Sequence, residues 1–243
     1  MSKSPMLLPL LAGWALMRPG RALRVGASSM AAAPLAEAPE ALRGLLAAGV
    51  ASPPVHGAYA HELHFDGGCR GNPGCGGCGA IVTDANSGAT LWAGWCFLPE
   101  ASTTNNVAEY AALVLGCEGL KALGLASCGL VGDSKLVVNQ VNGDWRCRDA
   151  RLSALRDRAL GLLDGVDFAI AHVPRAANGH ADALANHAMD SHTSGSCAPS
   201  SPSAPPPAAT GDRAAEKAAA LAVVASLRAL ADAEEKRIEE EYT

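Results

Sequence analysis

The chain has 243 residues, 49% of them apolar, and a formal net charge of −5 at pH 7. Its apolar content predicts a packed core, and its length allows one or two domains of ordinary size. An acidic chain lacks the general basic field of many nucleic-acid-binding proteins, so nucleic-acid binding has to be argued from a specific site. Ala, Gly, Pro and Ser dominate both ends, which predicts one folded domain with tails.

The N-terminal segment, residues 1–36, contains one lysine and three arginines but no acidic residue. This composition predicts an organellar transit peptide, for a mitochondrion or a plastid. A secretory signal is an alternative because residues 6–17 are apolar, although this run is shorter than the roughly 20 residues that span a bilayer. An uncleaved tail on a cytoplasmic or nuclear protein is the other alternative. Residues 37–57 are predicted to form a linker with a short helix that ends before Ser52-Pro53-Pro54.

Residues 58–190 contain the regular structure, beginning with three strands: "AYAHELHF", "CGAIVTDAN" and "ATLWAGWCFL". The glycine-rich "GGCRGNPGCGG" is predicted to be a loop between the first two. Apolar residues at helical spacing predict a helix from Asn106 to Gly124, followed by the buried strand "SCGLVGD". Two helices, the strand "VDFAIAHV" and the helix "NGHADALANHAMD" complete the order βββαβααβα. This order predicts an α/β fold in which helices pack on a mixed sheet.

The C-terminal part differs in composition from this domain. Residues 191–211 are rich in Pro, Ser and Ala and are predicted to form a disordered linker. Residues 212–243 favour a charged helix with one apolar stripe. This helix is expected either to remain solvated or to dock on the main domain or on a protein partner.

The eight cysteines follow no regular spacing. Cys75 and Cys78 form a single CxxC, with Cys69 just upstream, but a second pair at zinc-finger spacing is absent from the sequence. A structural zinc site is therefore the minor alternative. We interpret the cysteines as small apolar residues and as reduced thiols of an intracellular protein.

Four acidic residues lie at the ends of predicted elements: Asp66, Glu109, Asp133 and Asp182. Each has a structural explanation when taken alone. Glu109 follows Asn106 at the spacing of a capping box, Asp133 can cap the helix after it, and Asp182 can interact with a helix dipole.

Taken together, the four acids predict a metal site. If the first and fourth strands are neighbours, Asp66 and Asp133 meet, and two helix N-termini can bring Glu109 and Asp182 to the same end. Four converging carboxylates repel one another unless divalent cations lie between them, and their hard oxygen ligands suit Mg²⁺, with Mn²⁺ as a substitute. A pair of such metals about 3.5–4 Å apart supports phosphoryl transfer by stabilising the attacking and the leaving oxygen.

Four sequence blocks make the chain similar to type 1 ribonuclease H, and closest to the short plant and archaeal branch: "HFDGGCRGNPGCGGCGAIV", "TTNNVAEYAAL", "GDSKLVVNQVNGDW" and "HVPRAANGHADALANHA". The resemblance covers residues 58–190. It implies the ribonuclease H-like fold, a five-stranded mixed sheet with helices on both faces. It also implies that the four acids are the catalytic metal ligands. The implied activity is endonucleolytic hydrolysis of the RNA strand of RNA–DNA hybrids, with two metal ions, leaving 5′-phosphate and 3′-hydroxyl ends.

The same resemblance implies contacts with the hybrid. The family positions that contact the minor groove are matched by Cys69, Asn72, Asn105 and Asn106. Thr104 matches a residue of the pocket for a DNA phosphate, and Trp145 matches the tryptophan beside the DNA backbone. Minor-groove contact with the 2′-hydroxyl distinguishes RNA from DNA. The structural alternatives are turn-forming asparagines, a capping threonine and a core tryptophan.

The chain departs from the bacterial pattern in two respects. It has no basic helical protrusion between Asp133 and Asp182, only a modest cluster of five arginines: Arg146, Arg148, Arg151, Arg156 and Arg158. The family's mobile histidine before the last acid has no certain counterpart. Gapless matching gives His172 as an accessory residue, with Arg175 and His180 as the alternatives nearer the site.

These observations predict a Mg²⁺-dependent ribonuclease H that acts as a monomer on a hybrid duplex and does not bind a membrane. One alternative is a catalytically silent nucleic-acid-binding module on the same fold, because a fold alone does not guarantee chemistry. Another is an exonuclease or a junction resolvase of the same fold, although these lack the "GNPG" and "TNN" blocks at these offsets.

Overall fold

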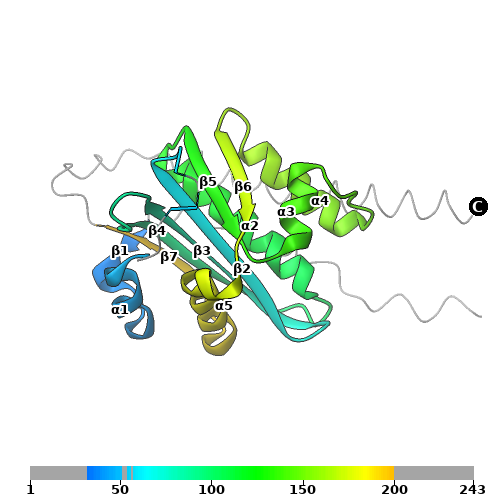
Figure 1. The fold of residues 1–243 in the computed structure, drawn as a ribbon. Helices are drawn as coiled ribbons and strands as arrows, with labels where there is room; N and C mark the ends of the chain where they lie inside the picture. The colour runs from blue at the N-terminus through cyan, green and yellow to red at the C-terminus, as the bar shows by residue number, and fades with distance from the viewer. Residues whose placement is uncertain (1–31, 51–53, 56, 200–243) are drawn as a thin grey trace, which may run out of the picture.

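The computed structural model describes residues 32–50, 54, 55 and 57–199, which form an α/β structure around one mixed sheet (Figure 1). The sheet strands are β1 (Ala33–Pro34), β2 (His61–Gly71), β3 (Gly74–Asp84), β4 (Thr90–Leu98), β5 (Ser127–Gly132), β6 (Asp167–His172) and β7 (Gly195–Ala198). The α-helices are α1 (Glu40–Ala48), α2 (Asn105–Leu123), α3 (Lys135–Asn142), α4 (Ala150–Leu162) and α5 (Gly179–Ser191). Short 3₁₀ turns, η1 (Leu35–Glu37) and η2 (Arg175–Ala177), precede α1 and α5.

The predicted core of the fold is confirmed. Strands β2, β3 and β4 are antiparallel neighbours, and β2 pairs in parallel with β5, which pairs in parallel with β6. The whole sheet has the order β1-β7-β4-β3-β2-β5-β6. The five predicted strands are therefore extended by two short ones at one edge. The neighbouring positions of β2 and β5 place the residues that follow Phe65 and Gly132 side by side, since these two residues are register partners.

The glycine-rich segment predicted to be a loop is mostly strand, so that prediction was wrong. The ladder between β2 and β3 continues to the pair Gly71–Gly74, which leaves only a tight turn. Glycine is a poor strand former, but here it allows helices to approach the sheet closely. A Cβ on Gly77 would lie 2.6 Å from the carbonyl oxygen of Ala185, and one on Gly79 would lie 2.6 Å from that of Ala181.

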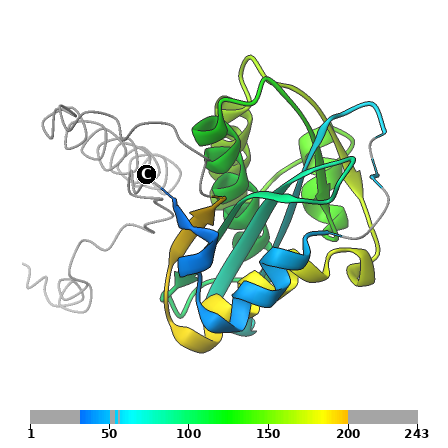
Figure 2. The ribbon, with the colours of Figure 1, turned by 90° about the vertical axis from the view of Figure 1, so that its left-hand side faces the viewer.

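Helices cover both faces of the sheet, as predicted (Figures 1 and 2). Helix α2 packs on β2, β3 and β4, with α3 and α4 on its side of the sheet, and α5 packs on the other face against the same three strands. Helix α2 lies between the sheet and α4, so most of its side chains are buried, among them Tyr110, Leu113 and Leu120. A second, smaller core lies between the sheet, α5 and α1.

The fold extends beyond the predicted boundaries of 58 and 190. The predicted linker, residues 37–57, contains the short helix expected there, α1, and its Leu42 and Leu46 belong to the second core. At the other end, β7 pairs with β4 and also, in parallel, with β1, so the segments on both sides of the predicted domain meet at one sheet edge (Figure 2). Residues 33–36, at the end of the predicted transit peptide, belong to β1 and η1.

Several predictions concern segments outside the described residues. These are most of the predicted transit peptide, residues 1–31, most of the predicted linker, residues 200–211, and the predicted C-terminal helix, residues 212–243. Within the described part of the chain, no helix has the length and apolar character needed to cross a membrane.

Candidate active site

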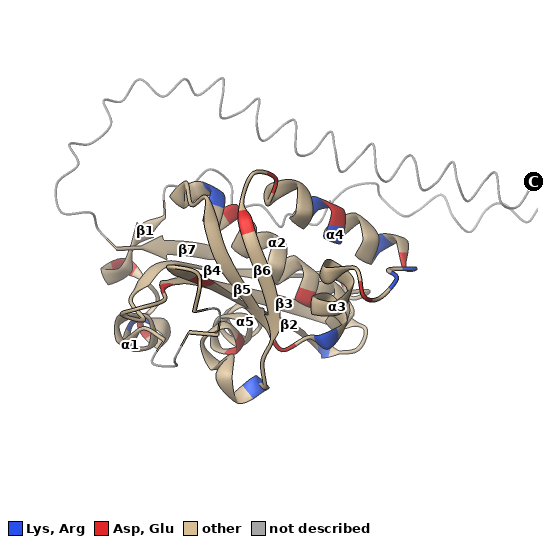
Figure 3. Ribbon diagram, turned by 45° about the horizontal axis from the view of Figure 1, so that its top comes forward, with Lys and Arg blue, Asp and Glu red and all other residues tan. Residues whose placement is uncertain are grey.

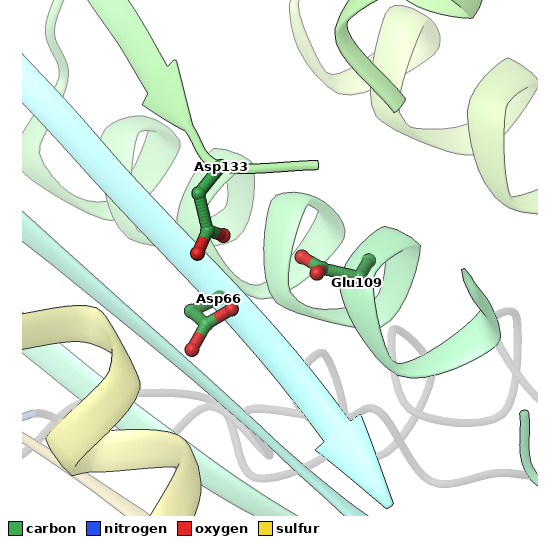
Figure 4. Close-up of side chains that lie close together, drawn as sticks. All are labelled: Asp66, Glu109 and Asp133. Atoms are coloured by element: carbon green, nitrogen blue, oxygen red, sulfur yellow. The ribbon is translucent and has the colours of Figure 1, made fainter. Parts of the chain in front are cut away.

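Three of the four predicted acids meet at one end of the parallel strands. Asp66 lies on β2, Asp133 directly follows β5, and Glu109 lies in the first turns of α2. A carboxylate oxygen from each lies within 4.8 Å of those of the other two, and the side chains point toward one another (Figure 4). The parallel pairing of β2 and β5 brings Asp133 to Asp66, and the packing of α2 on β2 brings Glu109 to Asp66.

The fourth acid, Asp182, lies in the first turn of α5 and lines the same pocket as Asp66 and Glu109. Its carboxylate forms an ion pair with Arg175 from η2. Asn186 on the next turn of α5 donates to Asp182 Oδ2 at 2.9 Å and fixes the other oxygen. All four predicted acids therefore face one region, although only three form the tight cluster.

Two of the structural explanations for these acids are not supported. Thr104 caps α2, because its hydroxyl accepts from the backbone N–H of Val107, so Asn106 and Glu109 do not form the capping box. Ser134, not Asp133, caps α3. Asp182 is in the first turn of α5, so its interaction with the helix dipole stands beside its place in the pocket. Glu109 and Asp133 are thus free of a capping role.

Burial and mutual repulsion disfavour ionisation of the cluster. Burial, followed by the charges of Asp133 and Asp182, raises the pKa of Asp66 to about 7. Burial, followed by the charges of Asp66 and Asp133, raises the pKa of Glu109 to about 9. Glu109 Oε2 is also buried without a hydrogen-bond partner. Carboxylates gathered in this way, with one oxygen unpaired, suit a hard divalent cation such as Mg²⁺.

A pH-dependent stability follows from these raised pKa values. Both acids bind protons more tightly in the folded than in the unfolded chain, so the free energy of unfolding of the metal-free protein should fall as pH rises from about 4 toward 7 and 9. A tenfold difference in proton affinity between the folded and the unfolded chain is worth about 1.4 kcal/mol, so the loss should reach a few kcal/mol. Thermal unfolding in a chelator and in excess Mg²⁺ measures this, and the metal should restore stability above neutral pH. Equal melting curves in both conditions at alkaline pH would contradict the prediction.

One site residue, Asn178, was missed by the sequence analysis. It is buried, with an exposed fraction of 1%, and its amide donates to the carbonyl oxygen of Phe65 at 2.9 Å and to Asp133 Oδ1 at 3.4 Å. It thereby connects the start of α5, which bears Asp182, to the middle of β2, which bears Asp66. A signal exists in the sequence, since Asn178 lies one helical turn before Asp182. The spacing alone, however, also fits an ordinary helix cap.

Three of the four predicted minor-groove residues, Cys69, Asn72 and Asn105, form one hydrogen-bonded group beside the carboxylates. Asn105 Oδ1 accepts from the backbone N–H of Cys69 at 3.1 Å and from its thiol at 3.0 Å, and Asn72 Oδ1 accepts from the backbone N–H of Asn105 at 3.2 Å. These bonds join the β2–β3 turn to the start of α2. Asn106 is exposed in the first turn of α2. Thr104 is the cap of α2, which agrees with its structural alternative and leaves its predicted phosphate contact untested.

Trp145, the arginine cluster and His172 do not line the pocket that Asp66, Glu109 and Asp182 share. Trp145 has an exposed fraction of 50%, so it is not a core tryptophan, and it precedes α4, along which several arginines lie (Figure 3). Three of the arginines, Arg151, Arg156 and Arg158, already pair with acids of the chain: Asp149, Asp157 and Glu118. His172 is exposed at the end of β6 and does not line the pocket, whereas Arg175 does. His180 packs near His64 and Gly49, on the α1 side.

Comparisons with known proteins agree with this geometry. Residues 64–188 match a family described as reverse transcriptase-like. Ribonuclease HI of Halobacterium salinarum is 41% identical over 138 residues, which cover 56% of this chain and 67% of that protein. The chain belongs to the type 1 ribonuclease H family. The match to the crystal structure of the Halobacterium salinarum enzyme covers 54% of this chain and 98% of the chain in that structure, at 40% identity and a TM-score of 0.51.

Two further relatives extend the comparison. A bifunctional protein of Mycobacterium tuberculosis, Rv2228c, is 39% identical over 141 residues, which cover 58% of this chain and 38% of that protein. LC11-RNase H1, solved in complex with an RNA/DNA hybrid, is 33% identical, with a TM-score of 0.51, and the match covers 54% of this chain and 98% of that one. With the family established and the acids assembled, the chain is a ribonuclease H, and the silent-module alternative is not supported.

Proposed function

We propose that this ribonuclease H hydrolyses the RNA strand of RNA–DNA hybrids with Mg²⁺ at the carboxylate cluster and leaves 5′-phosphate and 3′-hydroxyl ends. The observation that supports the proposal most directly is the convergence of Asp66, Glu109 and Asp133 within 4.8 Å. The hybrid bound to LC11-RNase H1 supports the substrate class.

The residues fit a site for divalent metal ions. Asp66, Glu109 and Asp133 would hold a metal, with Asp182 beside them at the pocket wall. A bound pair of metals would neutralise the negative charge of the phosphodiester and lower the pKa of the attacking water, and both effects favour hydrolysis. The protein's own part is to hold the carboxylates in place, and Asn178 and Asn186 do this through hydrogen bonds to Asp133 and Asp182.

Recognition of the RNA strand is assigned to the group around Asn72 and Asn105. Both are exposed beside the pocket, and their connection to Cys69 fixes their orientation relative to the carboxylates. Contacts to sugars and backbone carry little sequence information, so cleavage should show little sequence preference. The acidic net charge of the chain and the pairing of Arg151, Arg156 and Arg158 with acids predict weak binding of the polyanionic hybrid.

A cleavage assay tests the proposed function directly. Labelled RNA–DNA hybrid, double-stranded RNA and double-stranded DNA of one sequence are incubated with the full chain and Mg²⁺, and the products are resolved by length and end group. The proposal expects internal cuts in the RNA strand of the hybrid, with 5′-phosphate ends. Cleavage confined to chain ends would instead favour an exonuclease, and absence of cleavage in all three duplexes would refute the proposal.

The substrate contacts give a second test. Asn72→Ala should lower hybrid cleavage about tenfold to a hundredfold, since a polar group left without its partner costs about 1–3 kcal/mol. The Mg²⁺ concentration dependence should barely change, and Asn86→Ala, in the β3–β4 turn, serves as the matched control. Asn106→Ala is a cleaner probe than its spacing suggested, because Thr104 caps the helix.

A chemical change in the substrate separates contact from turn formation. A hybrid with 2′-deoxy substitutions beside the scissile phosphate should be cut more slowly by the wild type. The same substitutions should matter much less to Asn72→Ala, because the contact is already lost. If the two losses are additive, Asn72 is a turn residue and the hybrid is recognised elsewhere.

A further inference from the structure

Two cationic side chains line the pocket in the described part of the chain, Arg70 and Arg175. Arg70 is held at the rim, where it pairs with Asp190 at 2.7 Å and donates to Asn186 at 3.3 Å. Arg175 instead pairs with Asp182, one of the four predicted metal ligands. The two arginines therefore differ in kind, since one pairs with an acid outside the predicted metal set and the other with an acid inside it.

The backbone that bears Arg175 is firmly anchored on both sides. Before it, the N–H of Val173 donates to the carbonyl oxygen of Gly132 at 3.0 Å. After it, the N–H of Asn178 donates to the carbonyl oxygen of Arg175 at 2.9 Å, and the Asn178 side chain is bonded to Phe65. The side chain of Arg175 has an exposed fraction of 74%, so a fixed turn presents a long, solvated guanidinium. Such a group can leave its partner without disturbing the backbone.

The charge of Arg175 acts on the whole cluster. Asp182 first, and then Asp66 and Asp133, raise the pKa of the guanidinium above its ordinary value. Burial raises the pKa values of Asp66 and Glu109, and the charge of Arg175 opposes that rise at both residues. One positive charge is thus shared among four acids that repel one another, which is the electrostatic part that a divalent cation would play.

We propose that Arg175 is an internal counter-ion that stabilises the carboxylate cluster before metal binds and competes with Mg²⁺ for Asp182. This inference rests on the proposed metal site. A cation entering the cluster meets a ligand already paired with Arg175, and the arginine must yield that carboxylate. Loss of the charge should therefore have opposite effects on two properties: weaker stability without metal and tighter binding of metal. A residue that merely supports the fold would weaken both.

Arg175→Met tests this, because it keeps much of the aliphatic stem and removes the charge. Mg²⁺ binding to the full chain is measured by calorimetry at about pH 8.5, above the raised pKa of Asp66, where protons compete less for the carboxylates than at neutral pH. Arg175→Met should bind Mg²⁺ about threefold to tenfold more tightly than the wild type, as expected for removal of one partly exposed charge beside a divalent ion. In a chelator at the same pH, its melting temperature should be lower than that of the wild type.

Two further variants show whether charge is the cause. Arg175→Lys should retain Mg²⁺ affinity near that of the wild type. Arg151→Met removes an arginine of similar exposure, paired with Asp149 away from the pocket, and should leave Mg²⁺ affinity unchanged. Equal or weaker Mg²⁺ binding by Arg175→Met would overturn the inference. If the wild type itself neither binds Mg²⁺ nor is stabilised by it, the proposed metal site fails instead.

Discussion

Asp66→Asn should lower hybrid cleavage by at least about a thousandfold, because it removes a charged ligand from the centre of the cluster, where metal chemistry contributes several kcal/mol. Asp66 is buried, and it lies between the strand end that bears Asp133 and the helix that bears Glu109. The loss should appear in turnover, measured with saturating hybrid and a series of Mg²⁺ concentrations. Near-wild-type turnover would show that Asp66 is not a metal ligand.

The same substitution should stabilise the metal-free protein. The carboxylate of Asp66 is ionised above about pH 7, where burial and the charges of Asp133 and Asp182 make its ionised form destabilising. The neutral amide of asparagine avoids this destabilisation. The melting temperature in a chelator at alkaline pH should therefore rise, while the gain in stability on adding Mg²⁺ should shrink. Asp164→Asn, an exposed substitution after α4, is the matched control and should change neither property. A lower melting temperature in the chelator would contradict the account of repulsion.

Gly67→Ala should damage both stability and activity, because Gly67 lies where β2 touches the first turns of α2. A Cβ at this position would lie 2.1 Å from the carbonyl oxygen of Ala108 and 2.6 Å from the backbone nitrogen of Glu109. Neither contact can be relieved by rotating a side chain, so the strand or the helix must shift. Crowding of this kind costs about 1–3 kcal/mol or more, and a displacement near 1 Å at a reacting group costs about a hundredfold in rate.

The test compares Gly67→Ala with Gly161→Ala. Gly161 lies in α4, and a Cβ there meets nothing within 4 Å, so alanine should stabilise that helix by up to about 1 kcal/mol. Denaturant unfolding gives the stability difference, and turnover is measured well below the melting temperature of each variant. If Gly67→Ala retains wild-type stability and turnover, contact between β2 and α2 does not set the position of Glu109.

The fold was predictable because its elements are locally consistent. Alternating and helical apolar patterns correctly placed β2 to β6 and α2 to α5 in order, and the mixed sheet follows from that order. The glycine-rich segment was mistaken for a loop because only Gly71 and Gly74 flank the turn, whereas Gly77 and Gly79 lie in β3 and allow α5 to approach the sheet closely. Strand propensity, taken residue by residue, does not take account of the elements that pack against each residue.

The sequence pattern did not show that the sheet and the second core continue past residues 58 and 190, for a related reason. The segment before residue 58 looks like a linker because it is short and rich in alanine and proline. Leu42 and Leu46 of α1 find their partners on α5 and on the sheet, and β7 finds its partners in β4 and β1. Short elements such as these gain their stability from tertiary contacts, which a local pattern does not display.

The sequence by itself determined the identity of the four acids and the order of the strands that bring them together, because motif spacing and apolar periodicity are local properties. Only the tertiary structure decided how they meet: three carboxylates in a tight cluster, Asp182 held by Arg175, and Asn178 buried as a tie between strand and helix. Distances between residues far apart in the chain depend on packing between elements. The repulsion, the raised pKa values and the counter-ion all arise from those distances.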